Sequence, residues 1–303
     1  MSRGKVGELE VSEIGKFSLD LIEKIVYTRL GAGDPSVLVG PGHGKDNCII
    51  KVGGGQVLVA TADPLSIIPM LGLKNSAYIS VHLLASDLAT CGFPPRFFMV
   101  NLNLPPQMKD EEFEEYWTQI DIECKKLNVA IVGGHTGRYV GSDYTVVGGG
   151  VMMALAPEDK YLSSNMARPG DQIIMTKGTA IAATALLSLA FPQKIEKTYG
   201  SNFLEQAQQY IHKFSVVEDA LTAASVGLRE EGVTSMHDVT EGGLFGALYE
   251  LTKSANIGLE ISLQDVVVTE EAKLICQLFS LPLYSTLSEG PLIITSKPEK
   301  TPK

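Results

Sequence analysis

The sequence has 303 residues, of which 25 are Lys or Arg and 35 are Asp or Glu, so its formal net charge is −10. With 45% hydrophobic and 20% charged residues, the composition is that of a globular protein and not of a disordered chain. The negative charge offers no basic surface to a phosphate backbone, so we expect no nucleic-acid partner. The length favours two domains, because domains commonly contain about 150 residues.

The four cysteines, Cys48, Cys91, Cys124 and Cys276, are isolated and form no C-x-x-C pair. This spacing favours neither a structural zinc site nor a disulfide framework. The first ten residues lack the apolar core of a signal peptide. The longest apolar stretch, 180–191, is too short to span a bilayer. We therefore expect a cytoplasmic protein without membrane contact.

The first half of the chain is predicted to contain both helices and strands. Periodic apolar residues predict a helix over 17–30 with Ser18 as its N-cap, and a glycine-rich loop follows up to Lys45. Two β-rich runs, 48–52 and 57–61, flank three glycines and predict a hairpin. The further predicted elements are a helix over 75–91, a strand over 97–104, a helix from residue 110, a strand over 129–132 and a strand over 144–156. The glycines at 148–150 in the last strand predict a bulge or a close backbone approach.

A polar stretch over 157–170 predicts a linker between two domains, 1–157 and 158–303. In the second half we predict a strand over 172–176, and a helix that a capping box at 215–218 opens. A further helix, which carries Leu244, Leu248 and Leu251, follows Glu241-Gly-Gly243, and the last strand covers 292–295. This mixture predicts an α+β or α/β protein.

Common nucleotide and hydrolase motifs do not account for the glycine-rich segments. Gly44-Lys45 is followed by Asp46, and residue 39 is Val, so the P-loop pattern fails twice. No strand-bounded G-x-G-x-x-G, G-x-S-x-G or H-E-x-x-H is present. The sequence therefore supports neither a P-loop nor a Rossmann enzyme.

Acidic residues instead lie at predicted strand edges and beside glycine loops. Asp46 follows the glycine-rich loop, Asp63 is placed at the end of the strand over 57–61, and Asp87 lies in an otherwise apolar helix. Mg²⁺ prefers a few carboxylate oxygens and keeps positions for phosphate and water, so this set suits a metal–triphosphate site. Each residue alone has a structural alternative, since Asp is common in turns and a helical acid needs only a partner.

The densest polar cluster of the second half comprises His237, Asp238, Thr240 and Glu241, followed by Gly242 and Gly243 at the start of a helix. Backbone N–H groups and the helix dipole at such a position favour an anion. The alternative is a capping loop in which Thr240 or Asp238 is the N-cap. Glu289, before the last strand, is a similar and weaker case.

In their order along the chain, these segments resemble the motifs of the AIR synthase-related superfamily. The matching segments are Gly44-Lys-Asp-Asn-Cys48, Thr61-Ala-Asp63, Ser86–Pro94, Gly133-Gly-His-Thr136 and His237–Leu244. The superfamily includes aminoimidazole ribonucleotide synthase, selenophosphate synthetase, thiamine-monophosphate kinase and the hydrogenase maturation factor HypE. The chain looks most like HypE and its archaeal relatives. Thiamine-monophosphate kinases differ at 238–242, and selenophosphate synthetases use a reactive Cys or selenocysteine near the N-terminus.

The resemblance implies an α+β, two-domain PurM-like fold with an N-terminal domain that pairs into a dimeric β-barrel and a C-terminal α/β sandwich. It implies ATP and Mg²⁺ as cofactors, with Asp46, Asp63 and Asp87 as metal ligands. The implied ATP-binding residues are Lys45, Asp46, Asp63, Asp87, Gly133, Gly134, His135, Thr136, Gly242 and Gly243. The implied catalytic residues are Asp238, Glu241 and Glu289. The implied partners are a second copy of the chain, a maturation protein and a small-molecule or protein-borne substrate.

The implied activity is phosphorylation of a carbonyl or carboxamide oxygen with release of ADP and phosphate, in [NiFe] hydrogenase maturation. Three features depart from the family pattern: Lys45 replaces the first acid of Gly-Asp-Asp, His135 replaces an acid of several relatives, and the C-terminal cysteine of HypE is absent. The sequence also stops where relatives usually continue with a helix and a strand. Two alternatives therefore stay open, namely a phosphoribosylformylglycinamidine cyclo-ligase of purine biosynthesis and a nucleotide-binding scaffold without turnover.

Overall fold

The computed structural model describes residues 17–301, which divide at Pro35 into two compact units. In the first unit, helix α1 (Leu19–Ile25) is shorter than the predicted helix over 17–30. Ser18 occupies the N-cap, as predicted, although its side chain makes no capping hydrogen bond. The first ten residues, where we expect no signal-peptide core, lie outside the described residues.

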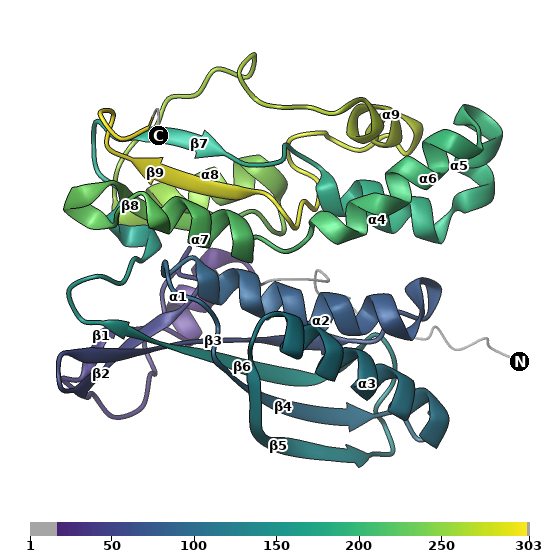
Figure 1. Cartoon of the computed structure of the whole chain (residues 1–303), viewed down its shortest axis with the longest axis horizontal. Coiled ribbons are helices and arrows are strands. Elements are labelled where there is room, and N and C mark those ends of the chain that lie inside the picture. Colours follow the sequence, from purple (N-terminus) through teal and green to yellow (C-terminus); the bar gives the residue numbers. More distant parts are fainter. Residues whose placement is uncertain (1–16, 302–303) are drawn as a thin grey trace, which may run out of the picture. The chain divides into compact units, whose positions relative to one another are not determined.

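Six strands of the second unit form one sheet with the order β1-β2-β3-β6-β4-β5 (Figure 1). They are β1 (Val37–Val39), β2 (Cys48–Gly53), β3 (Gln56–Ser66), β4 (Phe97–Leu104), β5 (Ala130–Arg138) and β6 (Val146–Pro157). Neighbouring strands are antiparallel except β4 and β5, which are parallel. The hairpin of β2 and β3 is confirmed, whereas β1 lies in a segment that we predicted to be a loop.

Strand β3 continues beyond the predicted end at residue 61, because β6 pairs with it along its whole length. Asp63 therefore lies inside the strand, opposite Gly150, and not at a strand end. The strand predicted over 129–132 is likewise longer than predicted. Residues 133–136, which follow it, are part of β5, and β5 extends to Arg138 because β4 pairs with it up to Leu104.

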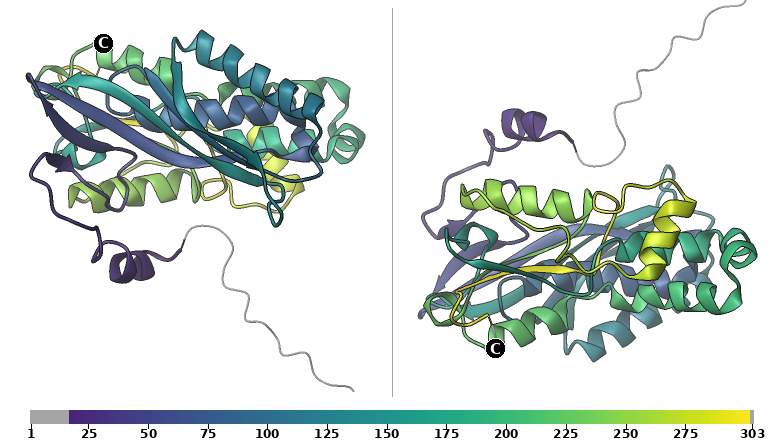
Figure 2. Two further views of the ribbon diagram at one scale, coloured as in Figure 1. Left: turned by 90° about the horizontal axis from the view of Figure 1, so that it is seen from below. Right: turned by 90° about the horizontal axis from the view of Figure 1, so that it is seen from above.

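Helices α2 (Gly72–Ala89) and α3 (Asp110–Lys126) cover one face of this sheet (Figure 1). Alternation along the strands turns Phe98 and Val100 toward the helices, and both side chains are buried. Within residues 36–301, no helix of the second unit covers the opposite face (Figure 2, left). The apolar side chains of Val52, Met99 and Leu155 are 37–54% exposed there.

The predicted close backbone approach at 148–150 is confirmed. A Cβ atom on Gly148 would lie 1.9 Å from the carbonyl oxygen of Asn101 on β4, and one on Gly150 would lie 2.6 Å from the ring of Phe98. Gly148 also has a φ of +152°. Only residues without side chains allow β6 to pass this close to its neighbours.

The second sheet has three antiparallel strands in the order β7-β9-β8. The strands are β7 (Gln172–Met175), β8 (Val233–Asp238) and β9 (Leu292–Ser296). The helices around it are α4 (Ile181–Ala190), α5 (Pro192–Tyr199), α6 (Ser201–Gln208), α7 (Val217–Ser225), α8 (Gly243–Ala255) and α9 (Glu270–Leu278). The apolar strand over 292–295 is the central strand, which explains why all five residues of β9 are buried.

In this half the predicted capping box is wrong, whereas α8 begins at the predicted glycines without the alternative capping side chains. The N-cap of α7 is Val216, so Ser215 lies one residue too early for a capping box. The N-cap of α8 is Gly242, in the left-handed conformation, and neither Thr240 nor Asp238. The predicted apolar face of α8 is confirmed, since Leu244, Leu248 and Leu251 are all buried.

The segment predicted to be a linker, 157–170, is packed against the rest of the chain. Its residues 161–164 are buried, and the backbone N–H of Leu162 donates to the carbonyl oxygen of Cys91. Among the described residues the four cysteines form no disulfide, and three of them are buried. No helix within residues 17–301 has the length and apolarity needed to span a membrane.

Candidate functional site

Five carboxylates from separate segments lie close together in the second unit. Asp46 precedes β2, Asp63 lies in β3, and Asp87 lies near the end of α2. Asp238 ends β8, and Glu289 precedes β9. Burial raises the pKa of the Asp87 carboxyl well above its usual value, and the negative charges of the other four acids raise it further. The structure thus places the three predicted metal ligands beside two predicted catalytic acids.

Hydrogen bonds hold the Asp46 segment against β3 and α2. The hydroxyl of Thr61 donates to the carbonyl oxygen of Asp46 at 2.7 Å. The side-chain amide of Asn47 donates to the carbonyl oxygen of Asp87 at 3.2 Å and to the hydroxyl of Thr90 at 3.0 Å. These contacts explain how two aspartates 41 residues apart in sequence are kept in one place.

The same segment is also fixed to α8 of the second half. Gly44 has a φ of +69°, and a Cβ atom there would lie 2.4 Å from the carbonyl oxygen of Glu250. The hydroxyl of Ser164 donates to the carbonyl oxygen of Gly44 and contacts the hydroxyl of Ser254 at 2.8 Å. Glycine at 44 is required both by the backbone angle and by the close approach of the helix.

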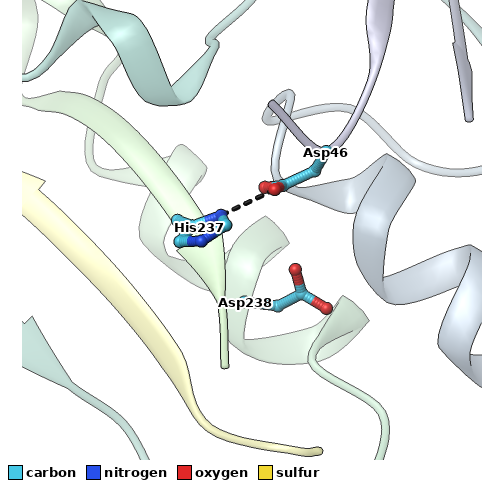
Figure 3. Close-up of side chains that lie close together, drawn as sticks. All are labelled: Asp46, His237 and Asp238. Carbon is cyan, nitrogen blue, oxygen red and sulfur yellow. Dashed lines mark hydrogen bonds and ion pairs between the residues drawn. The ribbon is translucent and has the colours of Figure 1, made fainter. Parts of the chain in front are cut away.

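His237 joins the two halves through its ring nitrogens. Nδ1 lies 2.6 Å from Oδ1 of Asp46 (Figure 3), and Nε2 lies 3.1 Å from Oε2 of Glu250. Burial alone would lower the pKa of this imidazole, but the charges and hydrogen bonds of Asp46 and Glu250, together with the charge of Asp238, raise it well above its usual value. The sequence placed His237 in a polar cluster without assigning it a role, and no sequence signal pointed to Glu250.

The group formed by Asp46, His237 and Asp238 has the geometry of a cation site. Each residue offers one ligand atom, and these atoms lie within 4.8 Å of one another. Oδ2 of Asp46 is buried and has no hydrogen-bond partner among the described residues. A buried carboxylate oxygen without a donor is costly unless a cation neutralises it. The donor set therefore fits a divalent ion.

Lys177 fixes the segment that carries Glu289. Its Nζ donates to the carbonyl oxygen of Gly290 at 3.0 Å, to the carbonyl oxygen of Ser215 at 2.6 Å and to Oδ2 of Asp219 at 2.6 Å. These three acceptors satisfy all the protons of the ammonium group. The turn before β9 is thus fixed to the start of α7.

Some predicted site residues do not lie with the carboxylates. His135 pairs with Asn101 of β4, whose side chain points away from the helices, whereas Asp63 lies on the helix-covered face. Strands β6 and β4 also separate β3 from β5, so His135 is about 14 Å from Asp63 within one chain. Gly133, Gly134 and Thr136 share this exposed strand.

The remaining predicted residues lie around the carboxylates with different exposures. Glu241 and Gly242 are exposed, and Gly243 is buried at the start of α8. A Cβ atom on Gly42 would lie 3.0–3.1 Å from the side chain of Lys45, so this half-buried side chain folds back over the glycine-rich loop. Lys45 therefore lies next to loop N–H groups.

Family profiles match two parts of the chain. The profile of the AIR synthase related protein N-terminal domain matches residues 44–154, and that of the C-terminal domain matches residues 168–303. Together they cover most of the sequence and nearly all of the second unit. Their descriptions agree with the superfamily that the motifs resemble.

Curated relatives with different activities are similar to this chain. A protein of Methanocaldococcus jannaschii named for hydrogenase expression and formation is 24% identical over 288 residues, which are 94% of this chain and 81% of the relative. The carbamoyl dehydratase HypE of Rhizobium leguminosarum is 23% identical over 84% of this chain and 70% of its own. A selenide, water dikinase of Carboxydothermus hydrogenoformans is 23% identical over 85% of this chain and 70% of its own.

Solved structures show the same fold. AaThiL complexed with AMPPCP and TMP has a TM-score of 0.71 at 16% identity, over 93% of this chain and 84% of that chain. The HypE–HypF complex has a TM-score of 0.70 at 17% identity, over 92% of this chain and 85% of that chain. HypE in complex with ATP has a TM-score of 0.62 at 18% identity, over 95% of this chain and 80% of that chain. The mixed α+β, two-domain PurM-like fold implied by the motifs is confirmed.

Proposed function

The chain belongs to the AIR synthase-related family, and from this premise we propose that it is an ATP- and Mg²⁺-dependent, HypE-like enzyme. It would phosphorylate a carbonyl or carboxamide oxygen and release ADP and phosphate. Three relatives and structural neighbours support a common use of ATP: a selenide, water dikinase, AaThiL with AMPPCP, and HypE with ATP. We propose a substrate similar to that of HypE because hydrogenase-related proteins are among the relatives.

The observation that carries this proposal is the convergence of four other carboxylates on that of Asp87. Carboxylates in such a group repel one another, so a folded chain keeps them together only if something compensates their charge. Mg²⁺ prefers oxygen ligands, retains several waters and is bound through one or two carboxylates together with phosphate oxygens. Asp46, Asp63 and Asp87 would hold the ion, which would screen the phosphate charge.

The residues around the carboxylates would position the triphosphate. Lys45 and the N–H groups of its glycine-rich loop supply positive charge and hydrogen-bond donors, as do the N–H groups at the start of α8. Asp238 and Glu289 lie on segments of the second half of the chain. From there they would accept a proton from the substrate or orient it.

We also propose a homodimer and a protein partner. The face of the first sheet opposite α2 and α3 exposes Val52, Met99 and Leu155, which a second copy of the chain would cover. Such pairing would join the six-stranded sheets of the two copies into the implied barrel. It would also bring β5, with Gly133–Thr136, toward the partner's site. A HypE–HypF complex among the structural neighbours supports a maturation protein as a further partner.

The first test is calorimetric titration of the chain with ATP and Mg²⁺, compared with the Asp63→Ala variant. We expect binding in the micromolar range that the substitution abolishes, because the ion loses one of its carboxylates. The matched control is Asp121→Ala, which removes an exposed carboxylate on α3. If the folded wild-type chain gives no binding heat at any workable concentration, the proposed nucleotide site is refuted.

Phosphate and ADP release then identify the acceptor. Candidate acceptors follow from the relatives: a carboxamide or thiocarboxamide, selenide, and thiamine monophosphate. We expect release to be stimulated by the carboxamide class. Binding without release, whichever acceptor is added, would instead identify the scaffold, and stimulation by formylglycinamidine ribonucleotide would identify the cyclo-ligase.

A further inference from the structure

The cation geometry at Asp46 includes a nitrogen donor. The ligand atoms of Asp46, His237 and Asp238 lie within 4.8 Å of one another, a spacing that one ion can bridge. His237 and Asp238 are adjacent on β8, and the Asp46 segment comes from the other half of the chain. The group therefore differs in chemistry from an all-carboxylate magnesium site.

The ring of His237 is held in the orientation that a ligand needs. Glu250 on α8 bonds Nε2 at 3.1 Å, which leaves Nδ1 directed at Asp46 (Figure 3). A carboxylate behind a histidine fixes the ring and its tautomer in many metal sites. The backbone of Glu250 lies close to the Asp46 segment, because its carbonyl oxygen packs against Gly44.

The unpartnered oxygen of Asp46 is a second indication of a bound ion, independent of the short distances among the three ligand atoms. The Asp46 side chain is only 6% exposed, yet its Oδ2 is buried without a hydrogen-bond partner among residues 17–301. His237 and Asp238 are 3% and 4% exposed, so bulk water does not screen their charges. An ion that binds here replaces the proton shared by Nδ1 and Oδ1, and that proton leaves to solvent.

We propose that Asp46, His237 and Asp238 form a mixed nitrogen–oxygen site for a first-row divalent ion such as Mn²⁺, Co²⁺ or Zn²⁺. Imidazole binds Zn²⁺ and Co²⁺ well and Mn²⁺ more weakly, and it is a poor ligand for Mg²⁺, which prefers oxygen. The site joins the two halves of the chain through one ion. It shares Asp46 with the proposed magnesium site and Asp238 with the proposed catalytic acids, but it needs no nucleotide, so histidine coordination can be tested separately from ATP binding.

The test uses Mn²⁺ alone as the probe, on the full chain without nucleotide. Electron spin echo envelope modulation detects nitrogen bound directly to Mn²⁺. We expect a nitrogen coupling in the wild-type chain, and we expect its pattern to change when the histidines are labelled with nitrogen-15. Labelling leaves the protein otherwise unchanged, so this measurement does not depend on a variant that folds.

Three variants then identify the histidine. His237→Gln should remove the coupling and weaken Mn²⁺ binding about tenfold or more, and Glu250→Gln should weaken binding about tenfold while the coupling remains. The control His212→Gln changes an exposed ring that contacts Tyr78 on α2, and it should change neither the coupling nor the affinity. Bound Mn²⁺ without histidine coupling in the wild type, or a coupling that survives His237→Gln, would overturn the proposal, as would no Mn²⁺ binding at all.

Discussion

At the scale of single residues, Asp87 opposes the stability of the fold. Its carboxyl is enclosed by the chain and faces the charges of four other acids, which together with burial raise its pKa well above the usual value. Like charges held at short range in a poorly screened place raise the free energy of the folded state. A residue that costs stability in this way is expected at a functional site and not in a structural core.

Replacement of this carboxylate should therefore stabilise the metal-free chain. In EDTA we expect Asp87→Asn to raise the free energy of unfolding by about 1 kcal/mol, which corresponds to a rise in Tm of about 2–4 °C. Mg²⁺ should raise the Tm of the wild type more than that of the variant. Differential scanning calorimetry measures both effects.

The matched control is Asp121→Asn on α3. Asp121 is 43% exposed and forms an ion pair with Lys125, so its replacement should change the free energy of unfolding by less than about 0.5 kcal/mol. A lower Tm for Asp87→Asn than for the wild type in EDTA would show that the clustered acids do not repel one another.

At the scale of elements, the second half depends on a polar connection between β7, α7 and β9. Lys177, just after β7, holds Asp219 on α7 and the carbonyl oxygen of Gly290 before β9. The ammonium group and the carboxylate are 22% and 16% exposed. A partly buried ion pair of this kind is costly to break from one side, because the remaining charge loses its partner.

We expect Lys177→Met to lower the free energy of unfolding by about 2–3 kcal/mol, near the lower end for a buried pair because some solvent reaches it. Urea denaturation followed by circular dichroism measures the loss. Lys125→Met is the control, because Lys125 is 75% exposed in its ion pair and should contribute less than about 0.5 kcal/mol. Equal losses in the two variants would contradict the role assigned to Lys177.

At the scale of the whole molecule, the uncovered face of the six-stranded sheet matters most. Helices α2 and α3 cover the other face (Figure 1), whereas Val52, Met99 and Leu155 expose apolar side chains along β2, β4 and β6. A contiguous apolar sheet face in contact with water favours association, and a second copy of the same face is self-complementary under two-fold symmetry.

We therefore expect the chain to sediment at twice its monomer mass, and Met99→Glu to shift it toward the monomer with unchanged circular dichroism. A charge at the centre of an apolar interface must be desolvated without a partner. Leu263→Glu places the same charge on an exposed loop of the second half and should leave the dimer intact. A monomeric wild-type chain at micromolar concentration would contradict the proposed pairing.

Much of the fold could be predicted from local sequence patterns. The strand over 97–104 and the start of the helix at Asp110 agree with β4 and α3, and the hairpin agrees with β2 and β3. These elements carry their own signals, namely alternation, an acidic first turn and a glycine turn. The order of the polar motifs was enough to identify the family, which the profiles confirm.

The tertiary structure decided how these motifs are used. Asp63 lies inside β3 because its partner β6 is about 90 residues away, beyond the reach of any local pattern. The bonds of His237 to Asp46 and Glu250 likewise join segments 191 and 13 residues distant. Local sequence determines which face a side chain occupies, whereas only the packing of distant segments brings charges together and sets their pKa values.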